Sequence, residues 1–292
     1  GGRYRREYLI GSGGMGEVWS AHDVRTGSRV ALKILPKDLF ARHPEARQRF
    51  ASEAWVLARI NSPFVVALHE NGTAAEEPYI ALELILGEDL YNVIERDGAM
   101  DPLRAVTLVR DVAEGLSCAH AVGVVHRDLK PETVMVVETE DGLVAKLIDF
   151  GIAQQRSRGP YITDKPVGTL HFMAPEQMCS AQVDARADQW ALGVVAYYLL
   201  TRELPFDGPT VRDVVRAVVR RPPVPVREHV AGLPGTLDTF FERALAKHPD
   251  DRFRDVLELA DCLSDALAPL RSGQHARVDL QRAMDAERAH GS

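Results

Sequence analysis

Cysteine, net positive charge and long apolar runs are all scarce in this chain of 292 residues, and each shortage excludes a class of protein. The 3 cysteines include no C-x-x-C pair, so we expect Cys118, Cys179 and Cys262 to be reduced rather than disulfide-bonded or zinc-bound. A net charge of -7 argues against a surface that coats nucleic acid. We expect no signal peptide, and no apolar run reaches the roughly 18 residues of a membrane helix. The longest run, Ala191–Leu200, predicts a helix buried on all sides.

Hydrophobic periodicity divides the chain into a β-rich first part and a mostly helical second part. From Tyr8 to Leu35, short alternations of Val, Ile, Leu and Gly predict antiparallel strands. Apolar residues after Pro44 recur at helical spacing, which predicts a helix entered through that proline. Two more strands are predicted at 65–70 and 79–84, and helices dominate after Gly87. The predicted fold class is α+β.

The helical part contains one hairpin between its helices. Asp101 and Pro102 form an N-cap and first-turn pair, which predicts a helix running to about His120. Two β-like runs, Val134–Val137 and Val144–Leu147, flank a turn sequence and predict the hairpin. Further helices are predicted at 184–200, 210–220, 237–247 and 255–267.

Two features of the first part suit a phosphate ligand. Residues 11–18, GSGGMGEV, match G-x-G-x-x-G-x-V, and a strand rather than a helix follows the last glycine. A turn between strands would explain glycines equally well, although glycines also let a backbone approach phosphates closely. Lys33 follows three apolar residues on the third strand, so we expect a partly buried ammonium that needs a counter-charge. Glu53, among apolar neighbours on the next helix, is the candidate partner.

The second part contains two acidic motifs in a specific order. His126–Thr133 reads HRDLKPET, and Asp149-Phe150-Gly151 follows the hairpin. Asp128 can orient an attacking hydroxyl or accept its proton, and Asp149 offers a hard carboxylate to Mg²⁺. Capping aspartates in unrelated turns would explain each motif alone, but not their order and spacing together with the APE at 174–176.

These motifs resemble those of Hanks-type serine/threonine protein kinases over residues 4–268, and the run GTLHFMAPEQM is similar to the bacterial branch. The resemblance implies a bilobal fold, with an N-lobe at 4–84, a C-lobe at 85–268 and a polar C-terminal tail at 269–292. It implies transfer of the γ-phosphoryl group of ATP to Ser or Thr hydroxyls, with Mg²⁺, or Mn²⁺ in its place. Implied partners are protein substrates, among them further copies of the chain phosphorylated in trans. We expect a cytoplasmic domain, either free or part of a longer membrane-anchored protein.

The resemblance also assigns roles by position. Asp128, Lys130, Lys33 and Glu53 would be catalytic, and Asp149 and Thr133 would face the metal. Asp188 would anchor the catalytic loop, Arg252 would pair with Glu176, and Leu82 would be the gatekeeper behind the adenine. The nucleotide would contact Ile10, Gly11, Gly13, Gly16, Val18, Ala31, Lys33, Glu83, Ile85, Asp89 and Met135, although plain core packing partly explains the apolar residues of this set.

Thr133 departs from the family pattern, which has a metal-binding Asn at this position. A hydroxyl on a short, β-branched side chain reaches less far than an amide, so we expect one metal to be held loosely and catalysis to be weakened. The alternative is a pseudokinase that acts as a nucleotide-binding or scaffolding module.

Arg127, next to Asp128, suggests regulation by phosphorylation, because such an arginine suits a further anion. The candidate acceptors in the segment that follows are Thr163, which we prefer, then Ser157, then Tyr161 and Thr169.

Overall fold

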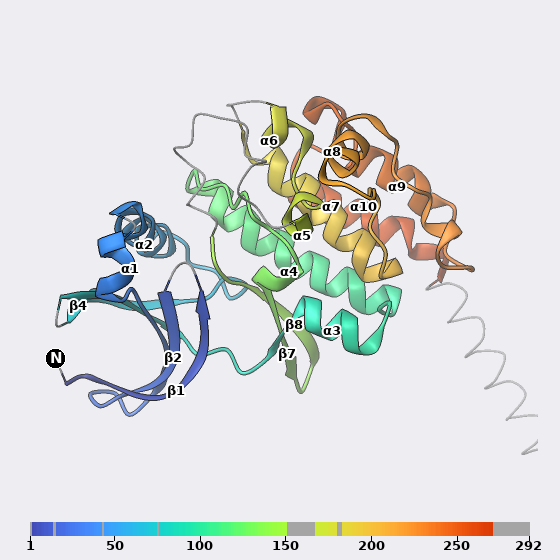
Figure 1. Ribbon diagram of the computed structural model, residues 1–292. Coiled ribbons are helices and arrows are strands. Elements are labelled where there is room, and N and C mark those ends of the chain that lie inside the picture. Colours follow the sequence, from blue (N-terminus) through green and yellow to red (C-terminus); the bar gives the residue numbers. More distant parts are fainter. Residues whose placement is uncertain are drawn as a thin grey trace, which may run out of the picture.

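The computed structural model describes residues 2–13, 16–42, 44–74, 76–150, 167–179 and 183–270. Its first part is a five-stranded antiparallel sheet in the order β1-β2-β3-β5-β4, with two helices beside it (Figure 1). The strands are β1 (Tyr4–Gly13), β2 (Gly16–Asp23), β3 (Arg29–Ile34), β4 (Leu68–Ala74) and β5 (Glu77–Glu83). The helices are α1 (Lys37–Arg42) and α2 (Pro44–Leu57). We call this part the N-terminal lobe.

The N-terminal lobe confirms the predicted strands and the helix entered through Pro44, with two differences. Helix α1 was not predicted, because its few residues are too short to show a helical period. Strand β4 begins at Leu68, three residues later than expected. Val65 instead forms an isolated bridge with Leu147, and Val66 donates a backbone hydrogen bond to the same residue at 2.9 Å. This segment therefore joins the two parts of the molecule.

The second part, the C-terminal lobe, is mostly helical, with a small sheet in the order β6-β7-β8 (Figure 1). Its sheet strands are β6 (Glu88–Asp89), β7 (Val134–Thr139) and β8 (Gly142–Leu147), which confirms the predicted hairpin. The first helices are α3 (Leu90–Asp97), α4 (Pro102–Ala121) and the 3-10 turn η1 (Pro131–Thr133). The remaining helices are α5 (Val167–Leu170), α6 (Pro175–Cys179), α7 (Arg186–Thr201), α8 (Val211–Arg220), α9 (Thr236–Ala244) and α10 (Val256–Ala266), with 3-10 turns η3 (Val226–Glu228) and η4 (Pro249–Asp251).

Side-chain caps set several of these helix starts. The Asp101 carboxylate accepts hydrogen bonds from the backbone N–H groups of Leu103 and Arg104 at 3.0 and 3.2 Å, as its position before Pro102 predicts. Asp255 caps α10 in the same way, through the N–H of Glu258. The predicted starts of α4 and α10 lie within one residue of these caps.

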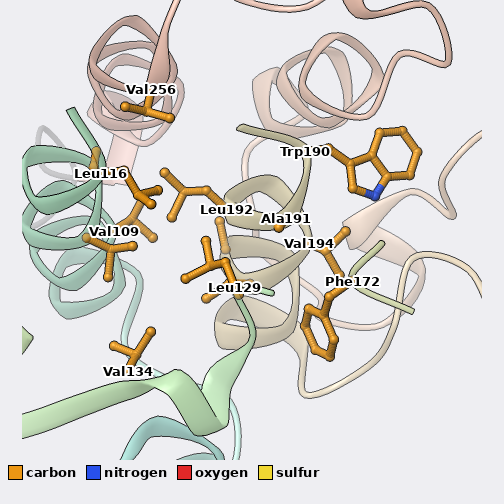
Figure 2. Packing of buried hydrophobic residues seen from close by; sticks show 14 of the residues in the cluster. Val109, Leu116, Leu129, Val134, Phe172, Trp190, Ala191, Leu192, Val194 and Val256 are labelled. Atoms are coloured by element: carbon orange, nitrogen blue, oxygen red, sulfur yellow. The ribbon is translucent and has the colours of Figure 1, made fainter. Parts of the chain in front are cut away.

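Helix α7 lies at the centre of the C-terminal lobe. Every residue from Ala187 to Thr201 is buried, which confirms the prediction of a helix with no solvent face. Helices α4, α9 and α10 pack around it. Figure 2 shows the packing between α4, α7 and α10 and the residues before β7; the labelled side chains are Val109, Leu116, Leu129, Val134, Phe172, Trp190, Ala191, Leu192, Val194 and Val256. Among the described residues, no helix is long and apolar enough to cross a membrane.

Candidate active site

The HRD stretch is held from beneath by a carboxylate of the central helix α7. Asp188 is fully buried, and its Oδ2 accepts a hydrogen bond from the His126 backbone N–H at 2.8 Å. Its Oδ1 accepts another from the Arg127 N–H at 2.7 Å. Its Oδ2 also lies 2.7 Å from His120 Nε2 at the end of α4. A buried charge needs such partners, so the carboxylate holds the backbone at Arg127 in its left-handed conformation, φ 65°.

This anchor confirms the Asp188 contact expected from the sequence, but His120 was missed. In the sequence, His120 indicates only the end of a helix. Its partner lies 68 residues away, so no local pattern could have indicated the contact.

Three polar side chains meet beside the HRD turn. Lys130 Nζ lies 3.3 Å from Asp128 Oδ2 and 3.4 Å from Thr169 Oγ1. The carboxylate and the ammonium are each about one fifth exposed, so a ligand from solvent can reach both. Thr169, on the short helix α5, belongs to this cluster, as expected. The Lys130 cation therefore contacts both a proton acceptor, Asp128, and a hydroxyl, Thr169.

A second charged cluster joins the lobes. Lys33 Nζ on β3 donates to Glu53 Oε1 and Oε2 at 2.7 and 2.9 Å, and to Asp149 Oδ1 at 3.0 Å. Lys33 and Glu53 are both only 4% exposed, which confirms the buried pair predicted from the apolar flanks of Lys33. Burial disfavours the ammonium, but Asp149 and Glu53 outweigh it and raise the pKa of Lys33. Burial raises the pKa of Glu53 in spite of the nearby ammonium.

The Asp149 carboxylate accepts a hydrogen bond from Lys33 and is also exposed to solvent. Asp149 follows β8 with a left-handed backbone, φ 55°, and its side chain is 54% exposed. Phe150 is buried, and its ring centroid lies 4.7 Å from that of His126. Burial lowers the pKa of the His126 imidazole, which favours the neutral ring. The Phe150 ring therefore fixes Asp149 against the HRD stretch, while the carboxylate faces solvent.

The Thr133 hydroxyl bonds to the backbone of Lys130, at the start of the same turn. Its Oγ1 donates to the Lys130 carbonyl at 2.9 Å and accepts from the Lys130 N–H at 3.2 Å. The residue is only 5% exposed and closes the turn η1. One lone pair of the hydroxyl is left for any further ligand. Among the described residues, no group of three or more His, Cys, Asp or Glu side chains could hold a metal. A hard cation here would therefore depend mainly on Asp149.

The strand registers pair some of the predicted nucleotide-facing residues within each sheet. Val18 lies opposite Lys33, and Ala31 lies opposite the buried Leu82. Asp89 pairs with Met135 across the small sheet. The Asp89 carboxylate also caps α3, since it accepts from the Asn92 N–H at 2.9 Å.

The ends of the glycine-rich segment flank residues that lie outside the described part of the chain. Gly11 and Gly13 belong to β1, on which Ile10 is 49% exposed. Gly16 has φ 114°, and a Cβ there would lie 2.2 Å from the Ile34 carbonyl oxygen. Glycine is therefore required at 16 by the close approach of β3, whether or not a phosphate binds.

The connection from β5 to β6 lies between the lobes, where the hinge was expected. The Glu83 carboxylate forms an ion pair with Lys146 and accepts a hydrogen bond from the Ala67 N–H. Ile85 is half-buried against the main core. The Glu83 backbone N–H donates to the Ala67 carbonyl at 2.9 Å.

The buried pair expected in the C-terminal lobe is confirmed. Arg252 donates to both carboxylate oxygens of Glu176, at 2.7 and 2.8 Å, and its side chain is fully buried. The sequence did not indicate that Lys247 would join it. The Lys247 ammonium lies 3.7 Å from the Phe206 ring centroid and 4.8 Å from that of Trp190. Burial, and then the charge of Arg252, lower the pKa of Lys247 to about 7.

Three of the candidate phosphorylation sites, Ser157, Tyr161 and Thr163, lie outside the described residues. The expected receiver of the phosphate is described. Arg127 Nη2 donates weakly to the Val183 carbonyl at 3.4 Å, and its buried Nε has no partner among the described residues.

Residues 4–261 match the protein kinase domain family. The chain belongs to this family. The serine/threonine-protein kinase PknB of Mycobacterium leprae is 36% identical over 263 residues, which cover 88% of this chain and 42% of PknB. The serine/threonine-protein kinase pkn2 of Myxococcus xanthus is 37% identical over 276 residues, covering 92% of this chain and 33% of pkn2. The crystal structure of the Mycobacterium tuberculosis PknI kinase domain superposes with a TM-score of 0.68 at 31% identity, covering 91% of this chain and 96% of that one.

These similarities show a serine/threonine protein kinase domain with the α+β fold expected from the sequence. The kinase domain spans about two fifths of the length of PknB, so the relatives contain further sequence that it does not match.

Proposed function

We propose that this kinase domain transfers the γ-phosphoryl group of Mg-ATP to Ser or Thr hydroxyls of proteins, itself included. The main support is that the two charged clusters coexist in one geometry. Lys33 contacts Glu53 and Asp149, while Asp128 contacts Lys130 next to Thr169. A chain that had lost catalysis would have no need to keep both.

In this proposal the nucleotide lies between the lobes. Ile10, Val18, Ala31 and Met135 enclose the adenine beneath the glycine-rich segment 11–16, and the backbone of residues 83–85 binds its edge. Lys33, held by Glu53, contacts the α- and β-phosphates, and Asp89 meets the ribose while it caps α3.

The chain's own residues then position the two reacting groups. Asp128 accepts a hydrogen bond from the substrate hydroxyl. It takes the proton as the new bond to the γ-phosphorus forms, while the bond from that phosphorus to the β-phosphate oxygen breaks and ADP leaves. Lys130 stands beside the transferring group, where its positive charge stabilises the negative charge of the transition state. Asp149 offers an exposed oxygen for Mg²⁺, or for Mn²⁺, which when bound to the phosphates neutralises part of their charge. Thr133 offers at most its remaining lone pair, directly or through a water.

The inward turn of the Thr133 hydroxyl supports a second candidate function. A kinase domain with one well-held metal at most is a weak enzyme, or it is a pseudokinase that binds nucleotide and presents a surface to partners. The charged clusters around Lys33 and Asp128, which are both present, favour the weak enzyme.

Regulation by phosphorylation is part of the proposal. A phosphate on Thr163 would bring a charge of about −1.5 to −2 near Arg127, whose buried Nε lacks a partner among the described residues. Ser157 is the next candidate. The cytoplasmic location expected from the sequence stays a prediction, as does phosphorylation between copies of the chain.

The deciding experiment is incubation of the pure protein with Mg-ATP or Mn-ATP, followed by intact mass. We expect added phosphate on the wild type and none on Asp128→Asn, since a general base contributes about 10²–10⁴-fold to such rates. Nucleotide binding is measured separately by thermal shift, where ATP at 100 times its Kd should add about 2.7 kcal/mol of stability. Binding without phosphate on the wild type, in either metal, would favour the pseudokinase.

A further inference from the structure

Helix α8 carries a stripe of arginines on its outer face. Arg212, Arg216 and Arg220 recur every four residues, so their side chains follow one line along the helix. All three are exposed, and so is Arg221, which follows directly. The opposite face, Val214, Ala217 and Val218, is buried against the core of the lobe. We call these four arginines the α8 stripe.

The α8 stripe has no counter-charge within the described part of the molecule. None of its four side chains takes part in an ion pair or hydrogen bond with another described residue. The acid on the same helix, Asp213, is turned to the helix start, where it accepts from the Thr210 hydroxyl. Elsewhere in the chain, surface arginines do find carboxylates: Arg96 with Asp97, Arg186 with Asp184, Arg202 with Glu95, Arg227 with Asp238 and Arg243 with Glu258.

This concentration of positive charge contrasts with the whole chain. The chain has 42 acidic against 35 basic residues and a net charge of -7, so its carboxylates are in excess. Like charges four residues apart on a helix repel each other and weaken it. An unpaired row of this kind is relieved when an anion binds along it.

The stripe lies next to the elements that would receive a substrate. Helix α8 packs against α5 and α6, and Figure 1 shows α8 beside α6. Helix α5 carries Thr169, whose hydroxyl contacts Lys130. The segment before α8 is also tied to this region, because Asp207 Oδ1 lies 3.1 Å from His171 Nε2. A protein bound along α8 is therefore held close to the acceptor side of the active site.

The geometry points to an acidic segment of a protein substrate as the ligand of the α8 stripe. Residues rich in Asp and Glu, separated by a linker from the Ser or Thr to be phosphorylated, would lie along α8. They would raise the local concentration of that hydroxyl near Asp128. Binding of the acidic segment is inferred from the α8 stripe alone. Its effect on the hydroxyl near Asp128 rests on the proposed function.

The test uses two fluorescent peptides that share one Thr-containing segment. One ends in six Asp and Glu residues, and the other ends in six Asn and Gln residues. Binding is measured by anisotropy, which requires no catalysis, and phosphorylation is measured by mass. The variants are Arg212→Gln/Arg216→Gln/Arg220→Gln and a matched control, Arg5→Gln/Arg25→Gln/Arg104→Gln. The control changes the net charge equally at exposed arginines far from α8 in the sequence.

We expect the acidic peptide to bind the wild type and the control about tenfold more tightly than it binds the α8 variant, since each exposed charge pair adds modestly. The difference should shrink in 1 M salt, where the screening length falls to about 3 Å. The neutral peptide should bind all three proteins alike. If the domain is also an active kinase, kcat/KM for the acidic peptide should fall in parallel in the α8 variant alone.

Several results would overturn the inference. Equal binding of the acidic peptide to the α8 variant and the control would show that only net charge matters. Vesicles with anionic lipid that bind through the stripe, while the peptide does not, would make it a membrane contact. Dimers that dissociate only in the α8 variant, again without peptide binding, would make it a contact between copies. Preferential peptide binding without any phosphorylation would uphold the stripe and count against the proposed activity.

Discussion

The two sides of the active site are held in different ways. In the C-terminal lobe, the HRD stretch receives hydrogen bonds from Asp188, a fully buried residue of a helix that is itself buried on every face. In the N-terminal lobe, Lys33 is held by two carboxylates, one of which belongs to the other lobe. A small apolar cluster, Ala21, Val30, Leu32, Ile34 and Ala81, lies on the sheet face opposite to the Lys33 side chain.

This difference indicates that the two sides should respond differently to bound ligands. The HRD stretch is bonded to a helix whose residues are all buried. The Lys33 contacts depend on charge, and so respond to phosphates, metal and protonation. Substitutions on the two sides should therefore separate loss of activity from loss of stability.

Lys33→Met should give the largest loss of activity. Loss of one positioned cationic donor typically costs about 10²–10³-fold in rate. The variant should also lose the thermal shift with Mg-ATP. Lys37→Met is the control, because Lys37 pairs with Glu76 on the exposed surface. A Lys33 variant that keeps wild-type phosphorylation would break the assignment of this side of the site.

Asp188→Asn should damage the other side through stability. The carboxylate accepts from two backbone N–H groups, and an amide would place one donor against a donor. Breaking such a buried charged network costs about 3–5 kcal/mol, which urea unfolding would measure. Asp97→Asn, at an exposed pair with Arg96, should leave the unfolding midpoint almost unchanged. Similar midpoints for both variants would contradict the buried anchor.

Thr133→Asn should have a smaller, opposite effect. The amide is longer than the hydroxyl that now closes η1, and can present an oxygen toward Asp149. We expect autophosphorylation to rise and to need roughly tenfold less Mg²⁺. Thr133→Ser keeps the hydroxyl and should behave as the wild type. If wild type and Thr133→Asn both bind ATP and both stay silent, the weak-enzyme interpretation is wrong.

Lys247→Met should give the smallest effect, visible only against pH. The pKa of Lys247 is about 7 in the folded chain, against about 10.4 when unfolded. Between these values the unfolded chain holds more protons, so the free energy of unfolding of the wild type should rise with pH. We expect the free energy of unfolding to rise by about 1–2 kcal/mol. This is less than the full difference between the two pKa values would give, because the rings of Trp190 and Phe206 favour the charged form.

The variant lacks this titration. Its free energy of unfolding, measured in urea at pH 7 and pH 10, should rise less than that of the wild type. An equal rise in the free energy of unfolding of the two proteins would contradict this prediction and indicate that the Lys247 ammonium is solvated.

Local patterns predicted the features that depend on neighbours in sequence. The apolar flanks of Lys33 indicated burial and a counter-charge, and Asp101 indicated a helix start. The strand predicted from Val65 began too early, because Val65 pairs with Leu147 across the molecule rather than within its own sheet. Lys247 resembled any surface lysine, since its aromatic neighbours lie 41 and 57 residues away.

The sequence by itself determined the chemistry of this protein: the order of the glycine-rich segment, Lys33, the HRD stretch and the DFG, and the replacement at Thr133. Side-chain type decides which groups can carry charge, donate protons or bind a metal. Only the tertiary structure decided which of them meet. Asp149 reaches Lys33 across 116 residues, and the Thr133 hydroxyl bonds to the Lys130 backbone. Contacts at hydrogen-bond distance depend on how the lobes and helices pack, which no local pattern encodes.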